Sequence, residues 1–130
     1  MKNRLLWICA GVLVLTIVCF QAVAHEWMAP RKAAELTSPL AVDDVVVAAG
    51  KKVYQENCGF CHGGALEGKS ADQAGLAKGP PNLIKSFKAH GEGDFFWKIK
   101  EGRGDMPSFK EELSPDQIWS VIGYISSESD

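Results

Sequence analysis

The hydrophobic positions near the C-terminus of this chain recur at the spacing of a helix. Ile118, Val121, Ile122 and Ile125 form one apolar stripe. The preceding Ser114-Pro115-Asp116-Gln117 supplies a capping serine, a proline at the first helical position and a glutamine for a capping box. We therefore predict a C-terminal helix that begins directly after Ser114.

Two further helices are predicted from cap residues. Aspartate is a favourable N-cap, so Asp43 or Asp44 begins a helix that runs to about Asn57. Asp94 is predicted to cap a short helix over residues 95–101. This helix should end at Gly102, because glycine readily adopts the backbone conformation that follows a helix.

The remaining segments predict loops. Glycine-rich stretches cover residues 59–82 and 104–110. Residues 25–42 form a lead segment with too little apolar periodicity for a core element, apart from a short helical turn over 31–36. We expect the lead segment either to drape over the domain or to lead away from a membrane.

The first 24 residues are typical of an export signal. Lys2 and Arg4 precede an apolar run over residues 5–20, and Ala22-Val23-Ala24 is a small-x-small cleavage site. A retained membrane anchor is the alternative, because residues 5–24 are about as long as a bilayer crossing requires. Either interpretation places the folded part in the periplasm or on the periplasmic face of the cytoplasmic membrane.

Composition and charge indicate one mildly acidic globular domain, which we place at residues 43–130. The chain has 130 residues, 46% hydrophobic and 23% charged. Of its 14 basic residues, Lys2 and Arg4 belong to the export segment, which leaves 12 against 16 acidic residues. Such a domain lacks the basic face that neutralises phosphates, so nucleic acid is excluded as a partner.

The cysteines carry the clearest chemical signal. Cys9 and Cys19 lie in the export segment, which leaves Cys58-Gly59-Phe60-Cys61-His62. This C-x-x-C-H pattern is typical of c-type haem attachment. Each thiol adds to a vinyl group of the porphyrin, and the adjacent imidazole ligates the iron. The motif predicts one covalently attached haem c, held by Cys58, Cys61 and His62.

Three other readings of the motif are weaker. A closed zinc site requires four ligands, and only His25 and His90 remain beyond the motif. A thioredoxin-like pair belongs near a βαβ pattern, and none is visible. A plain disulfide would leave His62 unexplained.

The iron needs a sixth ligand, and Met106 is the leading candidate. Its thioether is a soft ligand that raises the reduction potential, and Pro107 stiffens the glycine-flanked loop that carries it. Met28, in the lead segment, and His90 are the alternatives. His90 lies beside Gly91 in a polar stretch, where a surface position is the simpler interpretation.

A turn after the motif offers a hydrogen-bond acceptor. A ligating histidine usually donates its other ring N–H to a carbonyl, which fixes its tautomer. Pro80-Pro81-Asn82-Leu83 places the carbonyl of Pro81 within reach of that role. From the residues alone, an ordinary loop proline is an equally good interpretation.

Over about residues 45–126 the chain resembles the class I cytochrome c family, in particular its small bacterial single-haem members. The resemblance is carried by Gly50-x-x-x-Tyr54-x-x-x-Cys58-x-x-Cys61-His62, Gly79-Pro80-Pro81-Asn82-Leu83, Gly104-Asp105-Met106-Pro107 and a terminal helix with Trp119 and Tyr124.

The resemblance implies an all-α fold with three to four short helices around one haem. It implies that Pro81 accepts from His62 and that Met106 is the sixth ligand. It places Asn82 and Trp97 near the propionates or the haem face. Gly50 would allow the region of Trp119 or Tyr124 to approach closely.

These features predict an electron carrier and not an enzyme. The chain would pass single electrons between redox proteins, either as a shuttle or as a subunit of a membrane-bound respiratory or photosynthetic oxidoreductase. Four lysines could steer an acidic partner: Lys69, Lys78, Lys85 and Lys88. The alternative is a haem enzyme or gas/redox sensor with an open or labile sixth iron position.

Overall fold

The computed structural model describes residues 27–130, so the predicted export signal lies outside the described residues. The helices are α2 (Arg31–Ala34), α3 (Asp44–Asn57), α4 (Gly59–His62), α5 (Ala71–Ala74), α6 (Leu83–His90), α7 (Glu92–Glu101) and α8 (Pro115–Ser127). Within the described range the β-type pairing is limited to one bridge between Arg103 and Met106. The predicted all-α fold is confirmed. None of the helices in residues 27–130 has the length and apolarity to cross a bilayer.

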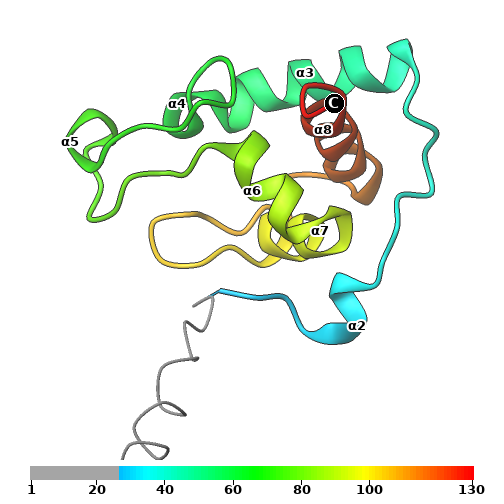
Figure 1. The fold of residues 1–130 in the computed structure, drawn as a ribbon, viewed down its shortest axis with the longest axis horizontal. Helices are drawn as coiled ribbons and strands as arrows, with labels where there is room; N and C mark the ends of the chain where they lie inside the picture. The colour runs from blue at the N-terminus through cyan, green and yellow to red at the C-terminus, as the bar shows by residue number, and fades with distance from the viewer. Residues whose placement is uncertain (1–26) are drawn as a thin grey trace, which may run out of the picture.

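The longest helices, α3 and α8, cross each other and form the centre of the core (Figure 1). At the crossing, Gly50 lies directly against the backbone carbonyl of Ser120, so a side-chain carbon at position 50 would overlap it. Glycine at position 50 is therefore required for the close approach. The buried residues around the crossing are Val53, Tyr54, Ile118, Trp119, Val121, Ile122, Tyr124 and Ile125.

The predicted caps hold both of these helices. The Asp43 carboxylate accepts from the Val46 amide at 2.8 Å. Ser114 and Gln117 form the reciprocal capping box, with bonds of 3.3 and 2.9 Å. Local sequence thus determines where α3 and α8 begin.

The prediction of a continuous loop over residues 59–82 is wrong in two places. α4 and α5 are single helical turns within it, and α5 has a capping box between Ser70 and Gln73. α6, which follows Asn82, was not predicted. Its hydrophobic residues are half-buried and depend on packing against α7 and α8, which a short sequence window does not reveal.

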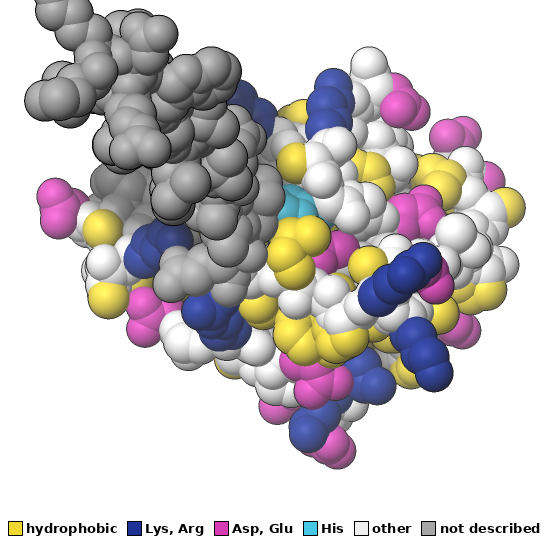
Figure 2. All heavy atoms as spheres, turned by 60° about the horizontal axis from the view of Figure 1, so that its bottom comes forward, with side chains coloured by type: hydrophobic (Ala, Val, Ile, Leu, Met, Phe, Trp, Pro, Cys, Tyr) yellow, Lys and Arg dark blue, Asp and Glu magenta, His cyan; other side chains and the backbone are white. Residues whose placement is uncertain are grey.

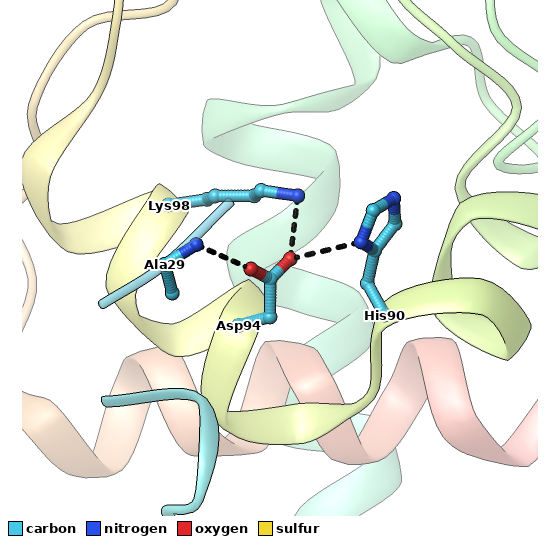
Figure 3. A network of polar contacts seen from close by, with 4 residues as sticks. All are labelled: Ala29, His90, Asp94 and Lys98. Carbon is cyan, nitrogen blue, oxygen red and sulfur yellow. Dashed lines mark hydrogen bonds and ion pairs between the residues drawn. The ribbon is translucent and has the colours of Figure 1, made fainter. Parts of the chain in front are cut away.

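Asp94 is not the N-cap of α7. The helix begins at Glu92 after Gly91, and Asp94 is the third residue of its first turn, with 1% of its surface exposed. Its carboxylate accepts from the Ala29 amide at 2.7 Å and pairs with Lys98 Nζ at 2.5 Å (Figure 3). His90 Nδ1 lies 3.5 Å from the same carboxylate. The Asp94 carboxylate therefore binds the Ala29 amide and Lys98 instead of capping the helix. His90 faces this buried carboxylate and is not the surface residue we expected.

The lead segment, of which residues 27–42 are described and are called the strap below, lies along α7 (Figure 1). Besides the bond from Ala29 to Asp94, the Ser38 amide donates to Glu92 Oε2 at 3.0 Å. Gly93 is buried against α2, where an added Cβ would lie 2.6 Å from the Leu36 carbonyl oxygen. The predicted helical turn is present as α2. The strap is therefore packed onto the domain through α7.

Candidate haem-binding site

The attachment motif lies at the junction of α3 and α4. Cys58 follows the last residue of α3, and its carbonyl accepts from the amides of Cys61 and His62 at 3.1 and 2.9 Å. This single turn places the two cysteines three residues apart on one helical face. Both thiols are half-buried and free, so the disulfide alternative is absent from the structure.

The environment of the thiols argues against a redox dithiol. Burial, and then the charge of Cys61, raises the pKa of Cys58 to about 11. A catalytic thiol of the thioredoxin type requires a lowered pKa. In residues 27–130, moreover, no three His, Cys, Asp or Glu side chains are grouped as ligands for a metal ion, so the zinc alternative gains no support.

His62 is held at both its backbone and its ring. Its carbonyl accepts from the Gly68 amide at 2.8 Å. Its Nδ1 lies 3.5 Å from the Pro81 carbonyl oxygen, at the outer limit of hydrogen-bond distance. Burial lowers the pKa of His62, and the contact with Pro81 partly opposes this. The ring is thus kept neutral, the form that ligates a metal, with one nitrogen directed at an acceptor.

Tyr54 is a site residue to which sequence reasoning assigned no role. It is fully buried, and its hydroxyl donates to the Gly63 carbonyl at 2.5 Å, directly after His62. Burial, followed by the charges of Cys58 and Glu67, raises the pKa of Tyr54, so the hydroxyl keeps its proton. Its only signal in the sequence is its place in the Gly50-x-x-x-Tyr54-x-x-x-Cys58 spacing.

The Pro80–Leu83 turn is tied to the chain that follows the motif. The Lys69 amide donates to the Pro80 carbonyl at 3.1 Å, and the Leu83 amide donates to the Leu66 carbonyl at 2.8 Å. The side-chain oxygen of Asn82 accepts from the Lys85 amide at 2.9 Å and so caps α6. Asn82 therefore has a structural role here, and its contact with haem stays a prediction.

Met106 lies in a turn that closes on itself after α7. Its amide and carbonyl exchange hydrogen bonds with Arg103 at 3.1 and 2.9 Å. The Met106 side chain is half-buried against the core. Asp105, next to it, accepts from the Ala77 amide at 3.3 Å and so joins this turn to the segment before Pro81.

The other candidates lie in different surroundings. Met28 is 51% exposed in the strap, and His90 faces Asp94. Trp97 is half-buried in α7. The ring stacked on Trp119, at 4.3 Å between centroids, is that of its neighbour Phe96. The structure thus leaves the predicted contact between Trp97 and haem as a prediction.

The donors and the apolar surface present fit a covalently attached haem. Two free thiols and a neutral imidazole come from α4, and a thioether comes from the turn after α7. Partly buried apolar side chains packed on the core suit a flat apolar cofactor; they are Leu83, Ile84, Phe87, Phe96 and Phe109. Figure 2 shows one face of the molecule, on which hydrophobic side chains are gathered.

Comparison with known proteins agrees with this geometry. Residues 45–125 match the family model described as cytochrome c oxidase, cbb3-type, subunit III. The chain is 33% identical over 87 residues to cytochrome c6 of Leptolyngbya boryana, covering 64% of this chain and 93% of the relative. It is 29% identical over 114 residues to cytochrome c550 of Pseudomonas aeruginosa, covering 82% and 70%.

Two longer proteins are also similar. The chain is 29% identical over 113 residues to the cbb3-type cytochrome c oxidase subunit FixPc of Rhizobium leguminosarum bv. viciae, covering 81% of this chain and 38% of the relative. A chain of the Kuenenia stuttgartiensis reducing HAO-like protein complex superposes with a TM-score of 0.53 at 26% identity, covering 75% of this chain and 49% of that one.

The family model spans more than half of the chain, and the relatives named above are c-type cytochromes or a cytochrome c oxidase subunit. The chain therefore belongs to the cytochrome c family and is a single-haem electron carrier with covalently attached haem c.

Proposed function

We propose that this protein passes single electrons between protein partners outside the cytoplasmic membrane, with Cys58 and Cys61 attached to the haem and His62 and Met106 as axial ligands. The bound haem iron supplies the one-electron redox chemistry. The chain itself supplies a neutral imidazole directed at the Pro81 carbonyl and a thioether in a stiff, self-bonded turn.

The observation that supports the proposal is a hydrogen bond between the segment before Pro81 and the turn that holds Met106. The Ala77 amide donates it to the Asp105 carboxylate. Met28 is exposed in the strap, and His90 faces the buried carboxylate of Asp94. Filling both axial positions with protein side chains leaves no open site for a gas or a peroxide, which favours a carrier over the haem enzyme or sensor.

The partner surface is proposed to be acidic. Lys78, Lys85 and Lys88 are exposed around the Pro80–Leu83 turn, and a cluster of one charge sign raises association rates. The Lys69 ammonium donates to the Phe60 carbonyl at 2.5 Å, which holds its positive charge beside the attachment motif. Phe60 itself is 81% exposed inside the motif, so an apolar contact is available beside these charges.

The test of the ligand set is an optical spectrum of the haem-loaded protein and of two methionine variants. Met106→Ala should abolish the weak far-red absorption band of sulfur-ligated ferric haem and allow carbon monoxide to bind the ferrous form. Met28→Ala is the matched control, because Met28 is exposed in the strap. It should leave both properties unchanged.

Carbon monoxide binding to the wild-type ferrous protein would contradict the carrier proposal, because it would show an open sixth position. Loss of the far-red band in Met28→Ala rather than in Met106→Ala would assign the ligand to the strap. The first result would favour the alternative of a haem enzyme or sensor. The second would require a different axial pair.

We further propose that the domain is fixed to a membrane complex rather than diffusing freely. The support is the strap, which is bonded along α7 and continues into residues 1–26, together with the match to the cbb3-type subunit model. Cells expressing the native chain should yield it in the membrane fraction, resistant to high-salt washing. Recovery in the soluble periplasmic extract, with an intact mass that begins at His25, would contradict the fixed subunit.

A further inference from the structure

Gly68 occupies a crowded position between the attachment motif and the Pro80–Leu83 turn. Its backbone is in the left-handed region, at φ +77°. An added Cβ would lie 2.6 Å from the Pro80 carbonyl oxygen, 2.6 Å from the Pro81 carbonyl carbon and 2.7 Å from the Asn82 amide nitrogen. All three are backbone atoms, so any side chain at position 68 forces the turn to move.

Gly68 also lies between two hydrogen bonds that join the same segments. Its own amide donates to the His62 carbonyl at 2.8 Å. The next amide, that of Lys69, donates to the Pro80 carbonyl at 3.1 Å. The backbone at residues 68–69 therefore bridges the proposed iron ligand and the turn that carries its acceptor.

We propose that Gly68 is a positioning residue that sets the contact between His62 and Pro81 and, through it, the electron donation from the imidazole to iron. The inference rests on the proposed role of His62 as a ligand. The distance from His62 Nδ1 to the Pro81 oxygen is 3.5 Å, already at the limit of a hydrogen bond. A displacement of the turn by a few tenths of an ångström therefore removes the bond.

The consequence for the iron has a definite sign. A hydrogen bond from the ring nitrogen that does not bind iron to a carbonyl makes the ligating nitrogen a stronger donor. Stronger donation favours the ferric state and lowers the reduction potential. Moving Pro81 away from His62 should therefore raise the potential.

The chain offers a matched control for this experiment. Gly75 is also in the left-handed region, at φ +66°, but an added Cβ there meets nothing within 4 Å. Gly68→Ala and Gly75→Ala in the full haem-loaded protein therefore both place alanine at a positive φ and differ in the close contact. We expect a raised potential for Gly68→Ala and a potential close to that of the wild type for Gly75→Ala.

A second readout follows the hydrogen bond directly. In the reduced protein, exchange of the His62 Nδ1 proton with water, measured by nuclear magnetic resonance, should be about tenfold faster in Gly68→Ala, as one lost hydrogen bond requires. Gly68→Asn and Gly75→Asn repeat the comparison with a residue that tolerates positive φ better. Equal potentials and equal exchange rates across the pairs would overturn the proposal.

The outcomes remain separate from those for the proposed function. Failure of both Gly68 variants to load haem, while both Gly75 variants load it, would reduce Gly68 to a folding role and overturn the proposal. Carbon monoxide binding to the wild-type protein would contradict the carrier assignment and leave the comparison of Gly68 with Gly75 intact.

Discussion

The two axial sides of the proposed haem site are held in different ways. On the His62 side, hydrogen bonds join several separate segments. Gly68 donates to His62, Leu83 donates to Leu66, and Tyr54 of α3 donates to Gly63. This side is therefore tied to α3, which is itself locked against α8 at Gly50.

On the Met106 side, the chain is bonded mainly to itself and to α7. Met106 and Arg103 bond to each other, and the Phe109 amide donates to the Ile99 carbonyl at 3.2 Å. The Ser108 hydroxyl donates to the Lys100 carbonyl at 2.7 Å. The position of Met106 thus depends on the position of α7.

The strap is connected to the Met106 side of the site through α7. α7 is the element to which the strap is bonded, through Asp94 and Glu92 at its first turn. A segment far from the attachment motif in sequence therefore supports the proposed sixth ligand. We infer that a substitution that loosens the strap should destabilise the Met106 side before the His62 side.

The largest expected effect comes from removing the carboxylate that fastens the strap. Asp94→Ala leaves Lys98 and the Ala29 amide without their partner inside the structure, and breaking a buried pair in this way costs about 3–5 kcal/mol of stability. Chemical denaturation of the haem-loaded protein measures the loss. The far-red absorption band should disappear at a lower denaturant concentration than the helical signal.

Glu35→Ala is the control for this variant. Glu35 pairs with Arg31 in the same strap, but both side chains are exposed, so its loss should cost less than about 1 kcal/mol. Similar costs for Asp94→Ala and Glu35→Ala would show that the strap does not support α7. Simultaneous loss of the absorption band and the helical signal would remove the distinction between the two axial sides.

A smaller effect is expected within the Met106 turn. Gly102 and Gly104 both have positive φ, at +68° and +59°. An added Cβ at Gly102 would lie 2.5 Å from the Ser108 nitrogen, whereas one at Gly104 meets nothing within 4 Å. Gly104→Ala should lose about 1–2 kcal/mol for its positive φ. Gly102, at φ +68° and ψ 172°, is in a region open essentially only to glycine, so Gly102→Ala should lose about 1–3 kcal/mol for the backbone conformation and more for overlap with the turn.

Thermal or denaturant unfolding measures the difference in stability between the two variants. The absorption spectrum shows whether the Met106 side is the one affected. Gly102→Ala should weaken the far-red band and leave the His62 Nδ1 proton protected. Equal stability of the two variants would mean that the turn shifts freely, and that Met106 is not held as tightly as His62.

The elements predicted correctly from sequence depend on interactions between near neighbours. The Asp43 cap, the capping box of Ser114 and Gln117, and the end of α7 at Gly102 each involve residues within a few positions of one another. The attachment motif belongs to the same class, because one helical turn brings its residues together. Local rules were sufficient for these features.

Two incorrect predictions concern Asp94 and His90, which meet at a carboxylate that also binds a distant segment of the chain. Asp94 matches the sequence of a helix cap, but its amide donor is Ala29, 65 positions away. His90 lies in a polar stretch, yet it faces the same buried carboxylate. A sequence window around Asp94 does not contain Ala29, and it does not show that the carboxylate facing His90 is buried.

The sequence by itself determined the cofactor chemistry, the all-helical class and the first residues of α3 and α8, because the motif and the caps involve neighbouring residues. Only the tertiary structure decided what Gly68 and Gly75 do. Gly68 and Gly75 lie in the same glycine-rich stretch and have nearly the same φ. One lies against the turn that carries Pro81 and the other faces open space, and that difference exists only once distant backbone segments have been brought together.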